Sequence, residues 1–245
     1  MKFFVGTSGW NYFHWKEAFY PAKLSSHRWL EYYAKHFNTV EVNMTFYRFP
    51  KESLLKGWYK RIPKDFKLTL KAPRQITHER KLKNVKKLIK SFYKIALVLQ
   101  DKLGCILWQF PPSLHFEKNK ATFLNFLEQL DPQVKNAIEF RHKSWWNSEV
   151  YKAMKKHKIA FCSVSSPKFP KEAIVTTSYA YFRFHGEEKW YRDEYSKRQL
   201  KEWANKIKKA VKKAKAKEVY CYFNNDFNAY AIKNAKMLKA LLKRY

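Results

Sequence analysis

Eight short apolar runs that are typical of β-strands alternate along the chain with longer segments of helical periodicity. The strand-like runs cover residues 3–8, 39–44, 66–71, 104–110, 136–140, 160–164, 179–185 and 218–223. The helical patterns cover residues 25–37, 51–62, 85–102, 119–130, 148–158, 196–217 and 230–245. Such alternation indicates βαβ units in a parallel sheet. Eight units in 245 residues predict an α/β fold with a single TIM-like (β/α)₈ barrel over residues 1–245.

One connection departs from the pattern. Residues 165–178, "SSPKFPKEAIVTTS", carry two prolines and little helical periodicity. We therefore expect the barrel to be irregular between its sixth and seventh strands. No repeat, Gly/Ser linker or low-complexity segment suggests a second domain.

The charge of the chain is strongly positive. Lys and Arg number 51 against 20 Asp and Glu, which gives a formal net charge of +31. Such a field attracts nucleic acids and anionic small molecules, so we expect a partner of one of these kinds. The alternative is a general basic bias without a specific partner. The Lys-rich, Gly-poor composition also resembles that of proteins from high-temperature organisms.

The cysteines and the apolar runs bear on location. Cys105, Cys162 and Cys221 are far apart and lie in or beside strand-like runs, which is typical of reduced thiols in the core of a cytoplasmic protein. No apolar run reaches membrane length, and the first residues, "MKFFVGTSGW", are too polar for a signal peptide. We expect a soluble cytoplasmic protein.

Polar and aromatic side chains gather where the predicted strands end, which is where barrel enzymes carry their active sites. They are Trp10, Tyr12, Glu41, Asn43, Tyr47, Lys71, His78, Gln109, Glu139, Arg141, Trp145, Arg183, His185, Asn224 and Asn225. Strand residues two apart point to the same side of a sheet. This spacing holds for Glu41 with Asn43, for Glu139 with Arg141 and for Arg183 with His185.

These residue types suggest roles. Glu41, Glu139 and His185 are the expected catalytic residues, because paired carboxylates and an imidazole suit acid and base catalysis. The remaining side chains of that group are expected to bind the substrate through cations, amides and aromatic walls. A structural layer of ion pairs that caps the barrel is the alternative.

Metal and cofactor signatures are sparse. His78, His185, Glu41 and Glu139 could hold a metal, but the chain has no HxH, HExxH or acidic cluster, so a metal site is not favoured. The dinucleotide, P-loop and nucleophile-elbow signatures GxGxxG, GxxxxGK[ST] and GxSxG are missing. No particular cofactor is predicted.

The strand-end motifs resemble, in order along the whole chain, those of the YecE-like family, domain of unknown function 72. The matching segments are "GTSGW", "FNTVEVNMTFYRFP", "PKDFKLTLKAP", "LGCILWQFPPS", "AIEFRHKSWW", "YFRFHG" and "YCYFNND". The resemblance implies a TIM-like barrel that resembles a hydrolase scaffold, with its pocket built from these motifs. One departure is Ala229, which stands where the family commonly has Gly and leaves the positions of Asn224 and Asn225 open.

Three functions fit these observations. The first is a hydrolase that acts on a phosphate-bearing substrate, a nucleic acid or a nucleotide. The second is a protein that binds single-stranded nucleic acid without catalysis. The third is a glycosidase-like hydrolase that uses the two glutamates.

Overall fold

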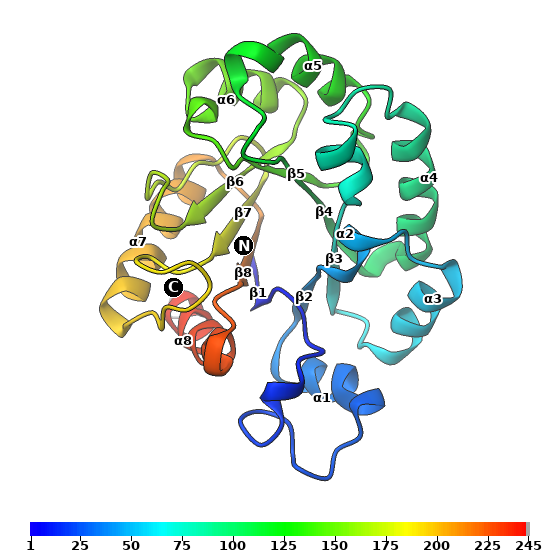
Figure 1. Ribbon diagram of the computed structural model, residues 1–245. Coiled ribbons are helices and arrows are strands. Elements are labelled where there is room, and N and C mark those ends of the chain that lie inside the picture. The colour runs from blue at the N-terminus through cyan, green and yellow to red at the C-terminus, as the bar shows by residue number, and fades with distance from the viewer. Residues whose placement is uncertain (244–245) are drawn as a thin grey trace.

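The computed structural model describes residues 1–243 and places eight parallel strands in one sheet, in the order β1-β8-β7-β6-β5-β4-β3-β2. The strands are β1 (Lys2–Thr7), β2 (Thr39–Val42), β3 (Lys67–Lys71), β4 (Leu103–Gln109), β5 (Asn136–Glu139), β6 (Ala160–Ser165), β7 (Tyr179–Phe184) and β8 (Glu218–Phe223). Figure 1 shows the helices arranged around the strands. The α/β barrel predicted from the alternation is confirmed.

The α-helices follow the strands in chain order. They are α1 (Trp29–His36), α2 (Met44–Tyr47), α3 (Glu52–Arg61), α4 (Lys86–Ala96), α5 (Phe116–Glu128), α6 (Ser148–Lys156), α7 (Lys197–Lys213) and α8 (Tyr230–Lys243). Short 3₁₀ or π turns are η1 (Phe13–Trp15), η2 (Ser26–Arg28), η3 (Gln75–Glu79), η4 (Leu97–Lys102), η5 (Lys143–Trp145) and η6 (Phe227–Ala229). As predicted, residues 166–178 between β6 and β7 form no helix.

Side chains and one backbone bridge close the ring between β1 and β2. Within residues 1–243, the bridge between Ser8 and Glu41 is the only one that joins these two neighbouring segments. The Tyr33 hydroxyl accepts from the Thr7 N–H at 2.9 Å and donates to the Thr39 carbonyl oxygen at 3.1 Å. Gly6 faces this seam, and a Cβ there would lie 2.2 Å from the Thr39 oxygen. The close approach therefore requires glycine at this position.

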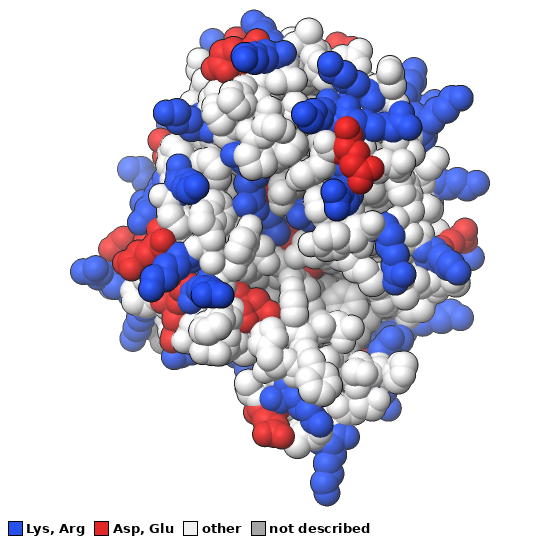
Figure 2. Space-filling view, viewed as in Figure 1, with Lys and Arg blue, Asp and Glu red and all other residues white. Residues whose placement is uncertain are grey.

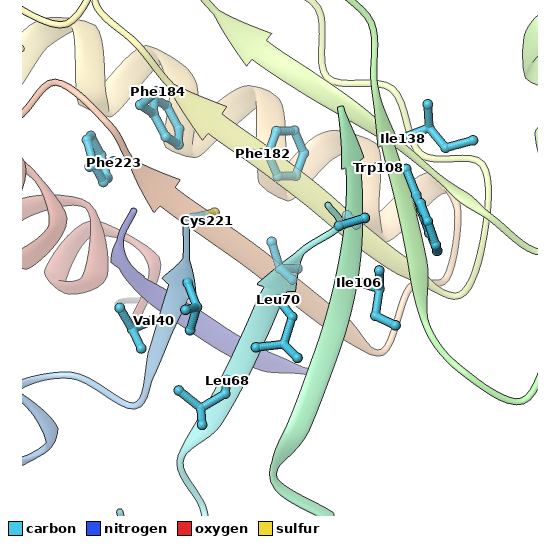
Figure 3. Packing of buried hydrophobic residues seen from close by; sticks show 14 of the residues in the cluster. Val40, Leu68, Leu70, Ile106, Trp108, Ile138, Phe182, Phe184, Cys221 and Phe223 are labelled. Carbon is cyan, nitrogen blue, oxygen red and sulfur yellow. The ribbon is translucent and has the colours of Figure 1, made fainter. Parts of the chain in front are cut away.

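Alternation along the strands separates the main core from the barrel interior. Leu68 and Leu70 of β3, like Phe182 and Phe184 of β7, pack outward beneath the helices (Figure 3). The residues between them face inward, and a second buried cluster fills the interior. At the end of a strand, the residue after an outward-facing apolar one therefore faces inward, at the mouth of the barrel. Lys71 follows Leu70 in this way, and His185 follows Phe184.

Two details of the helices differ from the sequence pattern. Residues 44–47 form the short helix α2 immediately after β2, where the sequence shows no helical periodicity. The predicted helix 85–102 ends as α4 at Ala96 and continues as a 3₁₀ segment in which Gln100 has a φ of 44°. Predicted residues 244 and 245 of the last helix lie outside the described part of the chain.

The cysteines lie in the core, as the sequence predicts. Cys105, Cys162 and Cys221 are buried and free. Across residues 1–243, no helix combines the length and the hydropathy that crossing a bilayer requires.

Candidate functional site

A cavity of about 870 Å³ opens at the carboxyl ends of the strands. Its wall comes from strand ends and from the segments after β1, β2, β5, β7 and β8. The lining residues are Tyr12, His14, Asn43, Tyr47, Lys71, Gln109, Arg141, Tyr191, Arg192, Asn224, Asp226, Phe227 and Asn228. A cavity at this end of a parallel barrel is where such folds carry their active sites.

A layer of buried ion pairs lies beneath this cavity. Arg183 donates from Nε and Nη2 to Glu41 Oε1 at 3.1 and 2.7 Å, and from Nη1 to Glu139 Oε2. The Tyr181 hydroxyl donates to the second Glu41 oxygen at 2.5 Å. Arg183 and both glutamates are almost completely buried, so the layer is closed to solvent.

Glu139 is the most heavily paired carboxylate of the layer, with hydrogen bonds from Arg141 and Arg183. Burial acts to raise its pKa, but the charges of the two arginines outweigh burial and hold the pKa well below its usual range. Glu139 is therefore an anion at neutral pH and a poor proton acceptor.

His185 completes the layer as a neutral imidazole. Burial, followed by the charge of Arg141, lowers the pKa of His185 to about 3. Its Nδ1 lies 3.3 Å from the Asn224 amide nitrogen. Its Nε2 lies 3.3 Å from Glu139 Oε1 and 3.3 Å from Arg141 Nη2. His185 thus links the buried layer to Asn224, which lines the cavity.

Arg141 connects the layer with the cavity. Its Nε donates to Glu139, while Nη1 reaches the Tyr191 hydroxyl at 3.2 Å and Nη2 lies 3.4 Å from Gln109 Oε1. The guanidinium also lies over the Trp190 ring, 5.0 Å from its centroid. These contacts hold the Arg141 guanidinium in place where it lines the cavity.

Lys71, the last residue of β3, is 8% exposed and lines the cavity. No hydrogen bond or ion pair joins its Nζ to any residue of the described chain. The nitrogen lies 3.9 Å from the centroid of the Phe46 ring. Burial, followed by the charge of Arg183, lowers the pKa of Lys71 to about 7.

Asp226 and His14 form a pair on another part of the wall. His14 Nε2 lies 3.1 Å from Asp226 Oδ2, and Trp15 Nε1 donates to Oδ1 at 2.6 Å. Burial raises the pKa of Asp226 to about 6, despite the opposing effect of His14. This carboxylate can take up and release a proton close to neutral pH.

The structure brings part of the predicted site together. Tyr12, Asn43, Tyr47, Lys71, Gln109, Arg141 and Asn224 line the cavity as expected. The predicted catalytic residues Glu41, Glu139 and His185 lie below it. A direct part for them in proton transfer stays a prediction, whereas their part in positioning Arg141 and Asn224 follows from the contacts above.

Three of the predicted substrate-binding residues do not line the cavity. Trp145 is fully buried, stacks on Phe140 at 4.6 Å and donates to the Leu114 carbonyl, so it belongs to the core. Arg183 is saturated by the two glutamates. Asn225 is buried and donates to Asn234 and to the Asp193 carbonyl.

Two further residues lie beside the main cavity. Trp10 lines a neighbouring pocket of about 490 Å³ that shares Tyr12 and Asn43 with it. His78 packs edge-on against Phe46, and its Nδ1 lies 2.8 Å from Thr77 Oγ1. Neither side chain lines the main cavity.

Sequence reasoning missed His14, Tyr191, Arg192 and Asp226. His14 and Asp226 could have been found from the sequence. Asp226 directly follows the Asn224-Asn225 pair, and β1 and β8 are neighbours in a closed barrel. The loops after these two strands must therefore meet. Tyr191 and Arg192 belong to the long loop after β7, which carries no spacing pattern.

Comparison with known proteins places the chain. A family model described as "Protein of unknown function DUF72" matches residues 4–245. The chain belongs to the DUF72 family. The resemblance drawn from its strand-end motifs is thereby confirmed.

Relatives and solved structures of the DUF72 family agree. The UPF0759 protein YunF of Bacillus subtilis is 24% identical over 98% of this chain and 94% of its own. The UPF0759 protein YecE of Escherichia coli K12 is 30% identical over 48% of this chain and 43% of its own. The crystal structure of a DUF72 protein from Thermotoga maritima has a TM-score of 0.87 and 32% identity, and covers 99% of this chain and 100% of that one.

A more distant DUF72 structure, from Enterococcus faecalis, has a TM-score of 0.85 at 22% identity and covers 98% of this chain and 95% of that one. It supports the barrel fold. Within residues 1–243, no three His, Cys, Asp or Glu side chains group together as potential metal ligands.

Proposed function

We propose that the cavity binds the phosphate group of a nucleotide or of a single-stranded nucleic acid and that the protein hydrolyses a phosphoester there. The observation that carries the proposal is Lys71, a lysine nine-tenths buried at the cavity wall whose amine has no hydrogen bond or ion pair in the described chain. A buried charge without a partner is costly. An anionic ligand would supply the missing partner.

The charges around the cavity floor support an anion site. Arg141, Arg183 and protonated Lys71 contribute three positive charges, while Glu41 and Glu139 contribute two negative ones. The salt bridges join both glutamates to the arginines, and none of them includes Lys71. Arg192 adds a further cation on the wall. Cations aimed at a phosphoryl group stabilise the charge on its oxygens during transfer.

Asp226 is the residue suited to proton transfer in this mechanism. As a carboxylate with a pKa near 6 it can accept a proton from an attacking water, and His14 is placed to share that proton. The phosphate would meanwhile lie against Lys71 and Arg141. In this mechanism, Glu139 and His185 position Arg141 rather than react.

The aromatic rim favours a nucleotide or a nucleic acid over a simple phosphate ester. Tyr47, Tyr191 and Phe227 line the cavity and are among the most exposed large apolar residues of the described chain. Exposed rings beside cations are typical of sites that stack the bases of single strands. The same rim favours the second candidate, binding of single-stranded nucleic acid without catalysis.

A glycosidase-like reaction is less well supported. Such enzymes need two carboxyl groups that flank the scissile bond. Here both glutamates are buried and bonded to Arg183, and neither lines the cavity.

A hydrolysis assay tests the proposal. Purified protein is incubated with p-nitrophenyl phosphate, bis(p-nitrophenyl) phosphate and end-labelled single-stranded RNA and DNA, with and without a chelator. We expect Asp226→Asn to slow hydrolysis by about 100- to 10,000-fold, the usual contribution of a general base. The chelator arm reports whether a metal takes part.

The control variant is Lys64→Met, which removes one positive charge at an exposed position before β3, at the opposite end of the strand from Lys71. It should retain full activity, whereas Lys71→Met should lose it. Binding of the labelled strands without any product would replace the hydrolase proposal with the second candidate.

A further inference from the structure

Two lysines of the chain are equally buried but differ in the hydrogen bonds of their amines. Lys71 and Lys102 are each 8% exposed, and each lies over an aromatic ring. The Lys102 nitrogen donates to the carbonyl oxygens of Tyr59 and Ile62, both at 2.7 Å. Lys71 has no such acceptor in residues 1–243 and lines the cavity. Lys102 is thus held for structure, while Lys71 is available for a ligand.

The surroundings of Lys71 favour an uncharged amine. Burial and the charges of Arg183 and Arg141 oppose its protonation, and together they outweigh the attraction of the Phe46 ring face, 3.9 Å from the nitrogen, for a cation. Because burial lowers the pKa of Lys71 to about 7, about half of the molecules carry a neutral amine at that pH. A neutral lysine amine is a nucleophile, and desolvation beside other cations is a known way to activate one.

We propose that Lys71 is a nucleophile that forms an imine with an aldehyde or ketone group of a phosphate-bearing substrate. The inference rests on the proposed phosphate site and goes beyond hydrolysis, because it assigns a covalent step to this residue. Arg141 and Arg192 would hold the phosphate in this case. Lys71 would then be free to react with the carbonyl group of the same molecule.

The covalent step balances without a further reactant. The nitrogen lone pair attacks the carbonyl carbon, the C–N bond forms, and the oxygen receives a proton to give a carbinolamine. Loss of that hydroxyl group as water, with a proton from nitrogen, leaves the C=N double bond. The resulting imine makes the neighbouring C–H group more acidic, and Asp226 is the carboxylate that lines the same cavity.

Reductive trapping tests this inference on the wild-type protein. The chain is incubated at neutral pH with glyceraldehyde 3-phosphate and limiting cyanoborohydride, which reduces an imine to a stable secondary amine. Peptide mapping by mass spectrometry then locates the adduct. At pH 7 the neutral fraction of Lys71 is about a thousandfold larger than that of an ordinary surface lysine. We expect Lys71 to be modified at least about tenfold ahead of exposed Lys64 and of buried Lys102.

Further arms separate this inference from the phosphate site. Lys71→Arg keeps the charge and should lose the adduct. Inorganic phosphate should protect Lys71 in the wild-type chain. Equal trapping by unphosphorylated glyceraldehyde, with no protection by phosphate, would support Lys71 as the nucleophile and refute the phosphate site. Modification of surface lysines with Lys71 untouched, in a protein that binds phosphate by calorimetry, would overturn the nucleophile alone.

Discussion

Asp226 and Lys71 titrate close to neutral pH, so the proposed hydrolysis should have a narrow pH optimum. Asp226 must be ionised to accept a proton, which requires a pH above about 6. Lys71 must be protonated to hold the phosphate, which requires a pH below about 7. The rate should therefore rise through the first value and fall through the second.

A pH–rate profile with bis(p-nitrophenyl) phosphate checks this, because the charge of that diester does not change in this range. Asp226→Asn should remove the acidic limb, and Lys71→Arg should remove the basic limb. A wild-type rate that stays flat from about pH 5 to about pH 9 would exclude both assignments.

Ala229 provides a residue-scale test of the last loop. Its φ is 57°, in the left-handed region that costs a non-glycine residue roughly 1–2 kcal/mol. Ala229→Gly should relieve this strain, although the added freedom of the unfolded chain returns about 0.4–1 kcal/mol. We expect a net gain of up to about 1 kcal/mol, or a melting temperature about 2–4 °C higher.

Ala210→Gly is the matched control for that variant, because Ala210 lies inside helix α7. The same change should there destabilise the protein by about 1 kcal/mol. Opposite signs are the diagnostic result. A lower melting temperature for Ala229→Gly would mean that the loop does not hold this conformation.

Individual site residues were predictable where strand parity placed them. Lys71, Gln109 and Arg141 follow strands whose alternation is plain in the sequence, so they reach the cavity as expected. Trp145 was misplaced because the residues that enclose it, Leu114, Phe116 and Phe123, come from a distant segment of the chain. The complete burial of Glu139 could not be predicted either, since strand alternation shows which way its side chain points but not what covers it.

At the scale of elements, the ion-pair layer joins β2, β5 and β7 through Arg183. Glu139→Gln keeps the shape of the side chain and removes the charge that both arginines contact. Breaking a buried pair in this way costs about 3–5 kcal/mol. We expect urea denaturation to show a loss of stability of that size.

Glu149→Gln serves as the comparison, because Glu149 pairs with Lys120 at an exposed position. Its loss should cost no more than about 1 kcal/mol. Equal, small effects of both changes would show that the layer contributes little to stability.

The sequence predicts the elements better than their ends. All eight strands were predictable, because their apolar residues alternate or run continuously between helical patterns. Helix α2 was not, since four residues are too few to show a helical period. The break at Gln100 was likewise hidden, because a positive φ at a non-glycine residue leaves no mark in hydrophobic periodicity.

At the scale of the whole molecule, the charge of +31 complicates tests of function. Figure 2 shows Lys and Arg side chains spread over the visible face rather than gathered in one stripe. Such a surface attracts any polyanion at low salt. Binding of nucleic acid alone therefore says little about the cavity, and a small anion is the better probe.

The most direct measurement is calorimetric titration of inorganic phosphate into the wild-type protein, Lys71→Met and Lys64→Met at about pH 6.5 and moderate salt. Both variants lose one positive charge, but only one loses it at the cavity. We predict binding to the wild-type protein and to Lys64→Met, and at least about a tenfold loss of affinity in Lys71→Met. Equal affinity in all three proteins would contradict the claim that the cavity is a phosphate site.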